Sequence, residues 1–180
     1  MDNQQVLSWT GPLSLASDCS ESFWNQEIAL KGHGIYTLSW PLNGGYLPHY
    51  IGMTEQSFVD RISQHISAFM SGKYYLYGVE ALDTGKKDYI YKPKDGLSEF
   101  LRRYSELSQQ LDLYFKKMSV FIAPVSEITK DELFIIEAKL TDSVYKGEYN
   151  NILDSPKPYN SRLDNEVVIV NRGDILPMGF

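Results

Sequence analysis

Residues 34–52 read GIYTLSWPLNGGYLPHYIG, and this stretch sets the fold class. Two runs rich in β-branched and aromatic residues flank Asn43-Gly44, a dipeptide that supplies the positive backbone angles of a tight hairpin turn. The sequence therefore predicts two antiparallel strands that carry one tyrosine each, Tyr36 and Tyr50. Alone, the stretch indicates only a hairpin, because most strand tyrosines simply pack on a sheet.

Helical patterns follow the hairpin at three places. Thr54 is a suitable cap for a helix from about residue 55 to 70. Apolar residues recur at helical spacing from about 96 to 117, which predicts one long amphipathic helix. Thr129 and Glu132 have the spacing of a capping box and predict the start of a further helix.

Strand patterns occupy the remaining apolar segments. The continuous apolar run at 119–125 predicts a buried central strand, and 166–170 predicts another strand. Segments 74–82 and 88–92 predict a second strand pair, joined through Thr84-Gly85. The expected class is α+β: a small antiparallel sheet of about three core strands flanked by helices, with an inserted hairpin and long helix.

The composition is that of one ordinary domain. At 180 residues with 43% hydrophobic residues, we expect a single domain, with 1–33, 72–117 and 153–180 added to its core as extension, insertion and extension. One cysteine, Cys19, excludes an internal disulfide and a cysteine-based zinc site, and we interpret His33 and His49 as loop or strand-end residues. Without a signal-peptide pattern or a long apolar run, we expect a soluble, cytoplasmic protein with no membrane partner.

The charge is unevenly distributed. The chain carries −6, which disfavours a large nucleic-acid footprint, but residues 86–117 hold eight basic and five acidic groups, a local balance of +3. Lys86, Lys87, Arg102 and Arg103 are the candidates for contact with a nucleic-acid substrate. The simpler interpretation of these residues is a solvated helix and loop.

Two polar residues border the apolar stripe of the first helix. Arg61 and His65 are four residues apart, so both project from one side, next to Phe58, Ile62 and Phe69. In isolation they would be a snorkelling arginine and an edge histidine.

Glu137 lies in the middle of the apolar face of the helix after Thr129. A carboxylate there needs a cation, a set of hydrogen bonds or a raised pKa, because burying a lone charge costs several kcal/mol. An ion pair with Arg61 or Lys130 is one solution. The other is a metal ligand, since Mg²⁺ is commonly held by one or two carboxylates with water and phosphate oxygens.

Taken together, these residues resemble the GIY-YIG nuclease superfamily. Both motifs that give the family its name are intact, and Arg61, His65, Glu137 and an asparagine follow in the family's order. The asparagine matches Asn150 or Asn151, of which we favour Asn150. The resemblance covers 34–52, 53–70 and 118–152.

The resemblance implies a three-stranded antiparallel sheet flanked by helices and metal-dependent hydrolysis of phosphodiester bonds, with Mg²⁺ or Mn²⁺ as cofactor. Glu137 would hold the metal and Arg61 would stabilise charge on the phosphate. Tyr36 would activate or orient the attacking water, with Tyr50 and His65 in supporting or proton-relay roles. Gly52 would allow a close backbone approach between strand and helix. The general base stays open, because a phenol near pKa 10 needs help to act as one.

The leading hypothesis is therefore an endonuclease acting on DNA, with a restriction-type enzyme as the natural subtype. The alternatives are a non-catalytic nucleic-acid or protein-binding module on the same fold, and a nuclease toxin that needs a partner. We expect target choice to come from the insertion, the termini, a homodimer partner or another protein.

Overall fold

The hairpin at the centre of the fold forms as the sequence predicts. The computed structural model describes residues 4–16, 19, 21–148, 150–163 and 167–180. Strands β3 (Gly34–Leu42) and β4 (Gly45–Thr54) pair antiparallel, and the two residues between them have positive φ, +52° at Asn43 and +79° at Gly44. These are the angles of a type I′ turn, whose twist matches that of the two strands.

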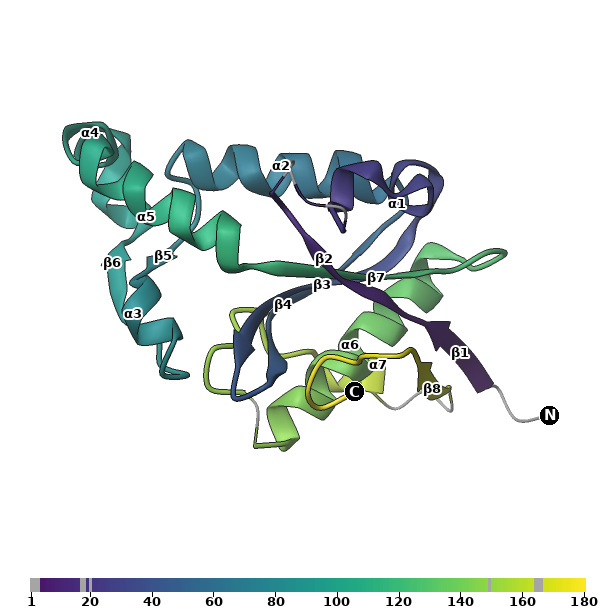
Figure 1. Ribbon diagram of the computed structural model, residues 1–180. Helices are drawn as coiled ribbons and strands as arrows, with labels where there is room; N and C mark the ends of the chain where they lie inside the picture. The colour runs from purple at the N-terminus through teal and green to yellow at the C-terminus, as the bar shows by residue number, and fades with distance from the viewer. Residues whose placement is uncertain (1–3, 17–18, 20, 149, 164–166) are drawn as a thin grey trace.

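The hairpin belongs to a four-stranded antiparallel sheet. The predicted buried strand is β7 (Ser119–Pro124), which pairs with β3, and the strand order is β2-β7-β3-β4 (Figure 1). The fourth strand, β2 (Thr10–Ser14), comes from the N-terminal segment and was not predicted. The core sheet therefore has one strand more than expected, and β4 is one of its edges.

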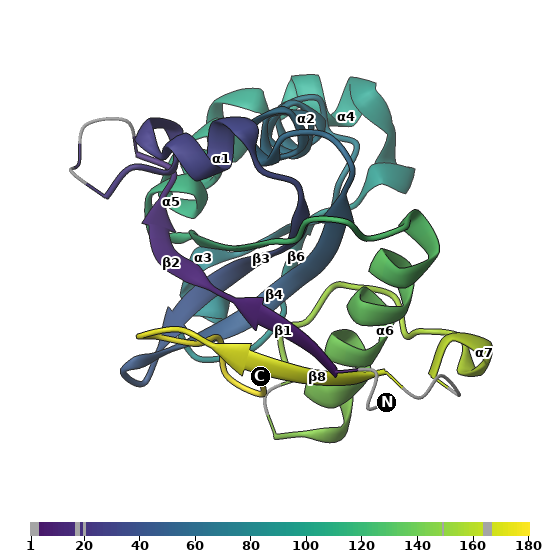
Figure 2. The ribbon, with the colours of Figure 1, turned by 90° about the vertical axis from the view of Figure 1, so that its right-hand side faces the viewer.

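Helices cover both faces of this sheet. Helix α2 (Phe58–Met70) and helix α5 (Tyr104–Lys117) lie on one face, and α6 (Lys130–Lys146) lies on the other (Figures 1 and 2). Side chains alternate along β3, so that Tyr36 packs in the cluster on the α2 side and Ile35 in the cluster on the α6 side. The generic α+β class is confirmed.

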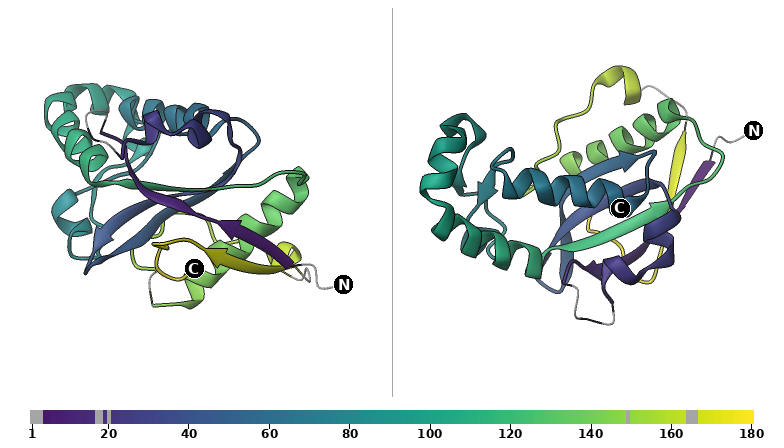
Figure 3. Two further views of the ribbon diagram at one scale, coloured as in Figure 1. Left: turned by 45° about the vertical axis from the view of Figure 1, so that its right-hand side comes forward. Right: turned by 90° about the horizontal axis from the view of Figure 1, so that it is seen from above.

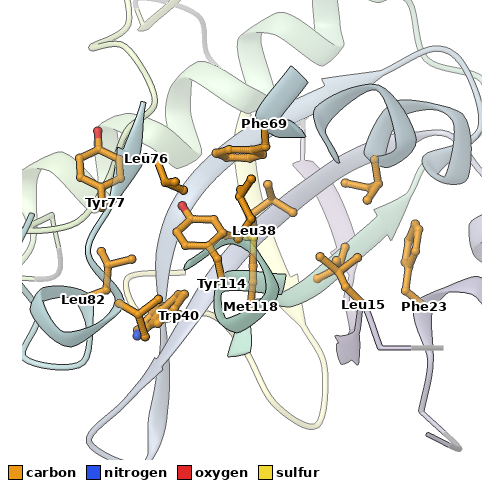
Figure 4. Close-up of a cluster of buried hydrophobic side chains, with 14 of the residues drawn as sticks. Leu15, Phe23, Leu38, Trp40, Phe69, Leu76, Tyr77, Leu82, Tyr114 and Met118 are labelled. Carbon is orange, nitrogen blue, oxygen red and sulfur yellow. The ribbon is translucent and has the colours of Figure 1, made fainter. Parts of the chain in front are cut away.

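The cluster on the α2 side joins the sheet to the insertion. Phe69 of α2 and Tyr114 of α5 pack 5.4 Å apart between ring centroids, beside Leu38 of β3 (Figure 4). Tyr77 and Leu82 of the insertion are buried in the same cluster. Segment 72–117 is thus packed on the core.

The insertion differs from its prediction in two places. Its strand pair is short, β5 (Leu76–Tyr77) with β6 (Tyr89–Tyr91), because Val79–Leu82 forms helix α3 where the sequence predicted strand. The expected helix over 96–117 is two helices, α4 (Gly96–Arg102) and α5. They meet at Arg103, which donates from Nη1 to the carbonyl of Ile90 (2.8 Å).

The start of α2 also differs. Ser57, not Thr54, is the cap, and its hydroxyl accepts from the backbone NH of Asp60 (3.1 Å). Thr54 is instead the last residue of β4, paired with Gly34. The capping box of Thr129 and Glu132 at α6 is confirmed.

The remaining elements lie around the sheet. Strand β1 (Gln4–Ser8) pairs in parallel with β8 (Val168–Arg172), which confirms part of the strand predicted at 166–170; residues 164–166 lie outside the described residues (Figure 2). Short helical segments complete the chain: Phe23–Asn25, α1 (Glu27–Lys31), Pro93–Asp95 and α7 (Asn160–Leu163). Within the described residues, we find no helix of the length and apolarity needed to cross a bilayer.

Candidate active site

The two motif tyrosines lie side by side on one face of the hairpin. In the β3–β4 register Tyr36 pairs with Gly52 and Leu38 pairs with Tyr50, so the tyrosines are diagonal neighbours facing α2. Their ring centroids are 6.2 Å apart. Tyr36 is fully buried, whereas Tyr50, on the edge strand, is only partly buried.

Gly52 makes room for this pair of rings. A Cβ atom at position 52 would lie 2.5 Å from the phenol oxygen of Tyr36 and 2.7 Å from the ring of Tyr50. The sequence analysis expected Gly52 to allow a close approach between strand and helix. In the structure Gly52 instead leaves room for the rings of Tyr36 and Tyr50. Through this gap the Tyr36 side chain crosses the edge strand.

Helix α2 brings Arg61 and His65 to the Tyr36 phenol. Arg61 Nε donates to Tyr36 Oη (3.1 Å), and Tyr36 Oη lies 2.7 Å from His65 Nε2. Because Arg61 is only a donor, Tyr36 accepts from it, whereas the direction of the Tyr36–His65 bond depends on which ring nitrogen of His65 carries the proton. The prediction that Arg61 and His65 project together from one side of the helix is confirmed.

Burial fixes the protonation states in this chain of hydrogen bonds. Burial raises the pKa of Tyr36 above its ordinary value, with Tyr50 adding to the effect and Arg61 opposing it. Burial and the positive charge of Arg61 lower the pKa of His65 to about 4. At neutral pH Tyr36 therefore keeps its proton, and His65 is neutral and able to accept from it.

A pH dependence of stability follows from the buried histidines. The pKa of His65 falls from 6.5 to about 4 on folding, as does that of His49, so the unfolded chain takes up protons first. The free energy of unfolding is therefore highest above pH 6.5. Between pH 6.5 and pH 4 it falls as the pH is lowered, by up to about 1.4 kcal/mol per pH unit for each histidine. Urea unfolding of the wild type and His65→Gln across this range measures the effect. The variant should lose stability less steeply, and equal slopes would contradict the assignment.

Glu137 reaches the same region from the opposite face of the sheet. It lines a cavity of about 450 Å³ together with Tyr50 and Arg61, at the end of β4 where α2 and α6 converge. The negative charge of Glu137 also contributes to raising the pKa of Tyr50, after the larger effect of burial. Three residues from separate segments of the chain thus face one cavity.

Glu137 is partly buried, although its place on the helical stripe predicted full burial. Its neighbours Leu133, Ile136 and Leu140 are buried under the sheet. Glu137 lines the cavity beside β4, the edge strand of the sheet. Both cations proposed to pair with Glu137 line the same cavity; Lys130 also bonds to Glu55 (2.9 Å), and Arg61 also bonds to Tyr36 and Gln64.

The donor set suits a hard cation that keeps much of its hydration. Among the described residues, no three histidine, cysteine, aspartate or glutamate side chains converge in the manner of a zinc or calcium site. Two carboxylates line this open, polar cavity, Glu137 and the Lys130-paired Glu55, and such a cavity fits Mg²⁺ or Mn²⁺, which take water and phosphate oxygens as their remaining ligands. Glu137 is the residue that would hold such an ion.

The predicted asparagine lies elsewhere. Asn150 Nδ2 donates to the carbonyl of Tyr145 (2.9 Å), and so closes the C-terminal end of α6. The described lining of the Glu137 cavity does not include Asn150, and Asn151 is exposed. The bond to Tyr145 accounts for the position of Asn150 in the turn after α6.

The predicted basic contacts are also spread out. Arg102 forms a forked pair with Glu99 and Arg103 one with Glu106, on α4 and α5, which lie far from α6 (Figure 1). Arg102 matches the solvated-helix interpretation, whereas Arg103 is half-buried and also bonds to the carbonyl of Ile90. Lys87 donates to the carbonyl of Leu153 (2.7 Å), and Lys86 is exposed.

The structure adds residues that the sequence did not single out. The ring of Tyr74 lies 5.6 Å from that of His65, and Gln64 accepts from Arg61 Nη1 (3.2 Å). His49, interpreted as a loop or strand-end residue, is instead buried in β4, where it bonds to Tyr114 and to the carbonyl of Ile152. A register shift beside it, between Leu38 and Ser39 on β3, turns His49 into the core, which periodicity alone cannot predict.

Comparison with known proteins gives no assignment: no protein-family model, no curated protein and no solved structure matches the chain.

Proposed function

We propose that this chain is a metal-dependent endonuclease of the GIY-YIG kind that hydrolyses phosphodiester bonds in DNA. The observation that carries the proposal is the shared cavity: Tyr50, Arg61 and Glu137, chosen on separate sequence patterns, line one hollow of about 450 Å³. Neither a plain hairpin nor an amphipathic helix requires this convergence. The site has the parts that phosphodiester hydrolysis needs, a carboxylate for a metal and a forked cation for phosphate.

Each residue has a role that follows from its position. Arg61 keeps its guanidinium at the cavity because Tyr36 and Gln64 accept two of its N–H groups, which leaves the rest of the fork for phosphate oxygens. Tyr36 is buried, so it acts as a positioning residue, through Arg61. A divalent metal at Glu137 would supply positive charge to the phosphate and lower the pKa of a bound water.

Tyr50 is the phenol that faces the attacking water in this arrangement. It lines the cavity, whereas the oxygen of Tyr36 is engaged by Arg61 and His65. Burial raises the pKa of Tyr50 as well, so it stays protonated at neutral pH. It therefore orients the water by hydrogen bonding and does not remove a proton.

The direct test is cleavage of supercoiled plasmid by the purified chain with Mg²⁺, with Mn²⁺ and with EDTA. Nicked or linear product that depends on metal supports the proposal. Cleavage that persists in EDTA, or binding of DNA without any turnover, contradicts it. The second result would place the chain with the non-cleaving binding modules.

Arg61→Ala should lower the cleavage rate by about 10²–10³-fold, the usual effect of removing one preorganised donor from developing negative charge. Arg61→Lys should recover only a small part, because an ammonium group cannot bond to Tyr36 and bind phosphate as a fork. Single-turnover cleavage rates measure both. Arg172→Ala, on the exposed end of β8, removes the same charge elsewhere and should match the wild type; a comparable loss there would show a general charge effect.

A further inference from the structure

A group of exposed aromatic rings extends from the candidate active site onto the insertion. Tyr74, Tyr75 and Tyr89 retain 36%, 42% and 44% of their surface, although tyrosines in contact with a core are normally covered. The rings of Tyr75 and Tyr89 are 5.3 Å apart. We call these three side chains the tyrosine platform; they come from β6 and from the residues just before β5. The β5–β6 pair lies at the end of the molecule beyond α2 (Figures 1 and 3).

The platform is continuous with the active-site residues through a second cavity. This cavity, of about 290 Å³, is lined by Tyr74 and Tyr75 of the platform together with Tyr50 and His65. Its volume is close to the lower end of small-molecule sites, about 300 Å³. Because Tyr50 also lines the Glu137 cavity, one ring separates the two hollows.

Positive charge accompanies the rings. Lys92 Nζ lies 4.7 Å from the ring centroid of Tyr89, and Lys73 lines the cavity. The acidic group at the cavity, Asp154, is hydrogen-bonded by Tyr77 and lies 3.9 Å from Lys87 Nζ, which offsets its charge.

Alternating aromatic faces and lysines are the chemistry that binds single-stranded nucleic acid. Every base has a face that can stack on a tyrosine, and lysines neutralise the phosphates between the bases. Stacked bases of an intact duplex cannot offer their faces in this way. An apolar peptide would not use the lysines, and an acidic one would not use exposed rings in series.

We propose that the tyrosine platform and its cavity hold unstacked bases of a single-stranded stretch, so that the adjoining phosphodiester lies at Arg61 and Glu137. The inference rests on the proposed function in one respect, namely that the phosphodiester held there is cleaved. It specifies the substrate class: strands with unpaired bases, such as flaps, gaps or single strands, in preference to intact duplex.

The test is fluorescence anisotropy of a labelled 12-nucleotide strand and of its blunt duplex, in EDTA so that nothing is cleaved. The single strand should bind more tightly than the duplex. Tyr75→Ala and Tyr89→Ala should each weaken binding of the single strand by roughly 5- to 100-fold, the range for loss of one stacking partner. Tyr75→Phe keeps an aromatic face and should bind like the wild type.

Tyr104→Ala is the matched control. Tyr104 is exposed to the same 44% as Tyr89, but its ring contacts Phe100 of α4, and it is not among the described residues that line the cavity. It should leave binding unchanged. Equal affinity for duplex and single strand, or wild-type binding by Tyr75→Ala and Tyr89→Ala, overturns the inference.

The metal-free design separates this inference from the proposed function. If the wild type cuts plasmid with Mg²⁺ but the platform variants bind the single strand normally, the nuclease proposal stands and the platform is wrong. If no condition gives cleavage but Tyr75→Ala loses single-strand binding, the platform stands on a chain that binds without cutting.

Discussion

Glu137→Gln is expected to reduce Mg²⁺-dependent cleavage by about 10²–10⁴-fold, with little change in stability. The amide keeps the size of the carboxylate but cannot neutralise a cation, and metal stabilisation of the transition state is worth several kcal/mol, with each 1.4 kcal/mol equal to a factor of ten. Glu137 is partly buried at the rim of a cavity, so the substitution leaves the packed face of α6 intact. Single-turnover cleavage at saturating enzyme gives the rate, and urea unfolding gives the stability.

The matched control is Asp131→Asn, which removes one negative charge from the exposed first turn of the same helix. It should cleave like the wild type. A second readout does not depend on activity: free Mn²⁺, followed by its electron paramagnetic resonance signal, should be bound by the wild type and by Asp131→Asn but not by Glu137→Gln. Wild-type cleavage by Glu137→Gln would end the metal assignment, because the cutting would then come from a contaminant.

The hairpin and the helices α2 and α6 could be predicted from the sequence because the interactions that form them are local. Asn43-Gly44 sets the turn through its own backbone angles, and Thr129 with Glu132 caps α6 through bonds within one turn. Ser57 and Thr54 are both competent caps for α2. The choice between them is made by the sheet, because Thr54 is held in the ladder opposite Gly34.

Elements whose partners lie far along the chain were the ones missed. Strand β2 contains a Gly-Pro step that reads as a turn, and it becomes a strand only by pairing with β7, more than 100 residues later. The break at Arg103 likewise depends on Ile90 of another element. Local preference cannot report such tertiary contacts.

The candidate site divides in the same way. The i, i+4 spacing predicts that Arg61 and His65 project from one side of α2, but their meeting with Tyr36 was implied only by the family resemblance. Glu137 and Tyr50 line one cavity because β4 is an edge strand of the sheet. The periodicity of the sequence does not show which strand lies at an edge. Asn150 donates to the carbonyl of Tyr145, outside the described lining of the Glu137 cavity, and its catalytic role stays a prediction.

Gly52→Ala is expected to damage both stability and activity, although it adds only a methyl group. The new Cβ would lie 2.5 Å from Tyr36 Oη and 2.7 Å from the Tyr50 ring, well inside van der Waals contact. Overpacking of this kind costs about 1–3 kcal/mol. Relief requires Tyr36 to move, and its oxygen carries the hydrogen bonds to Arg61 and His65. A shift of about 1 Å in catalytic groups costs on the order of 10²-fold in rate.

Urea unfolding and plasmid cleavage of the same preparation measure both losses from Gly52→Ala. Gly78→Ala is the control, since a Cβ there would meet its nearest neighbour, Ile90, at an ordinary 3.5 Å. It should match the wild type in both assays. If Gly52→Ala also matched the wild type, Tyr36 would be free to move without consequence, and its hydrogen bonds could not be what holds Arg61 at the cavity. A loss of cleavage larger than the loss of folded protein would instead tie the position of the Tyr36 ring directly to phosphodiester chemistry, since only the fraction that folds can cut.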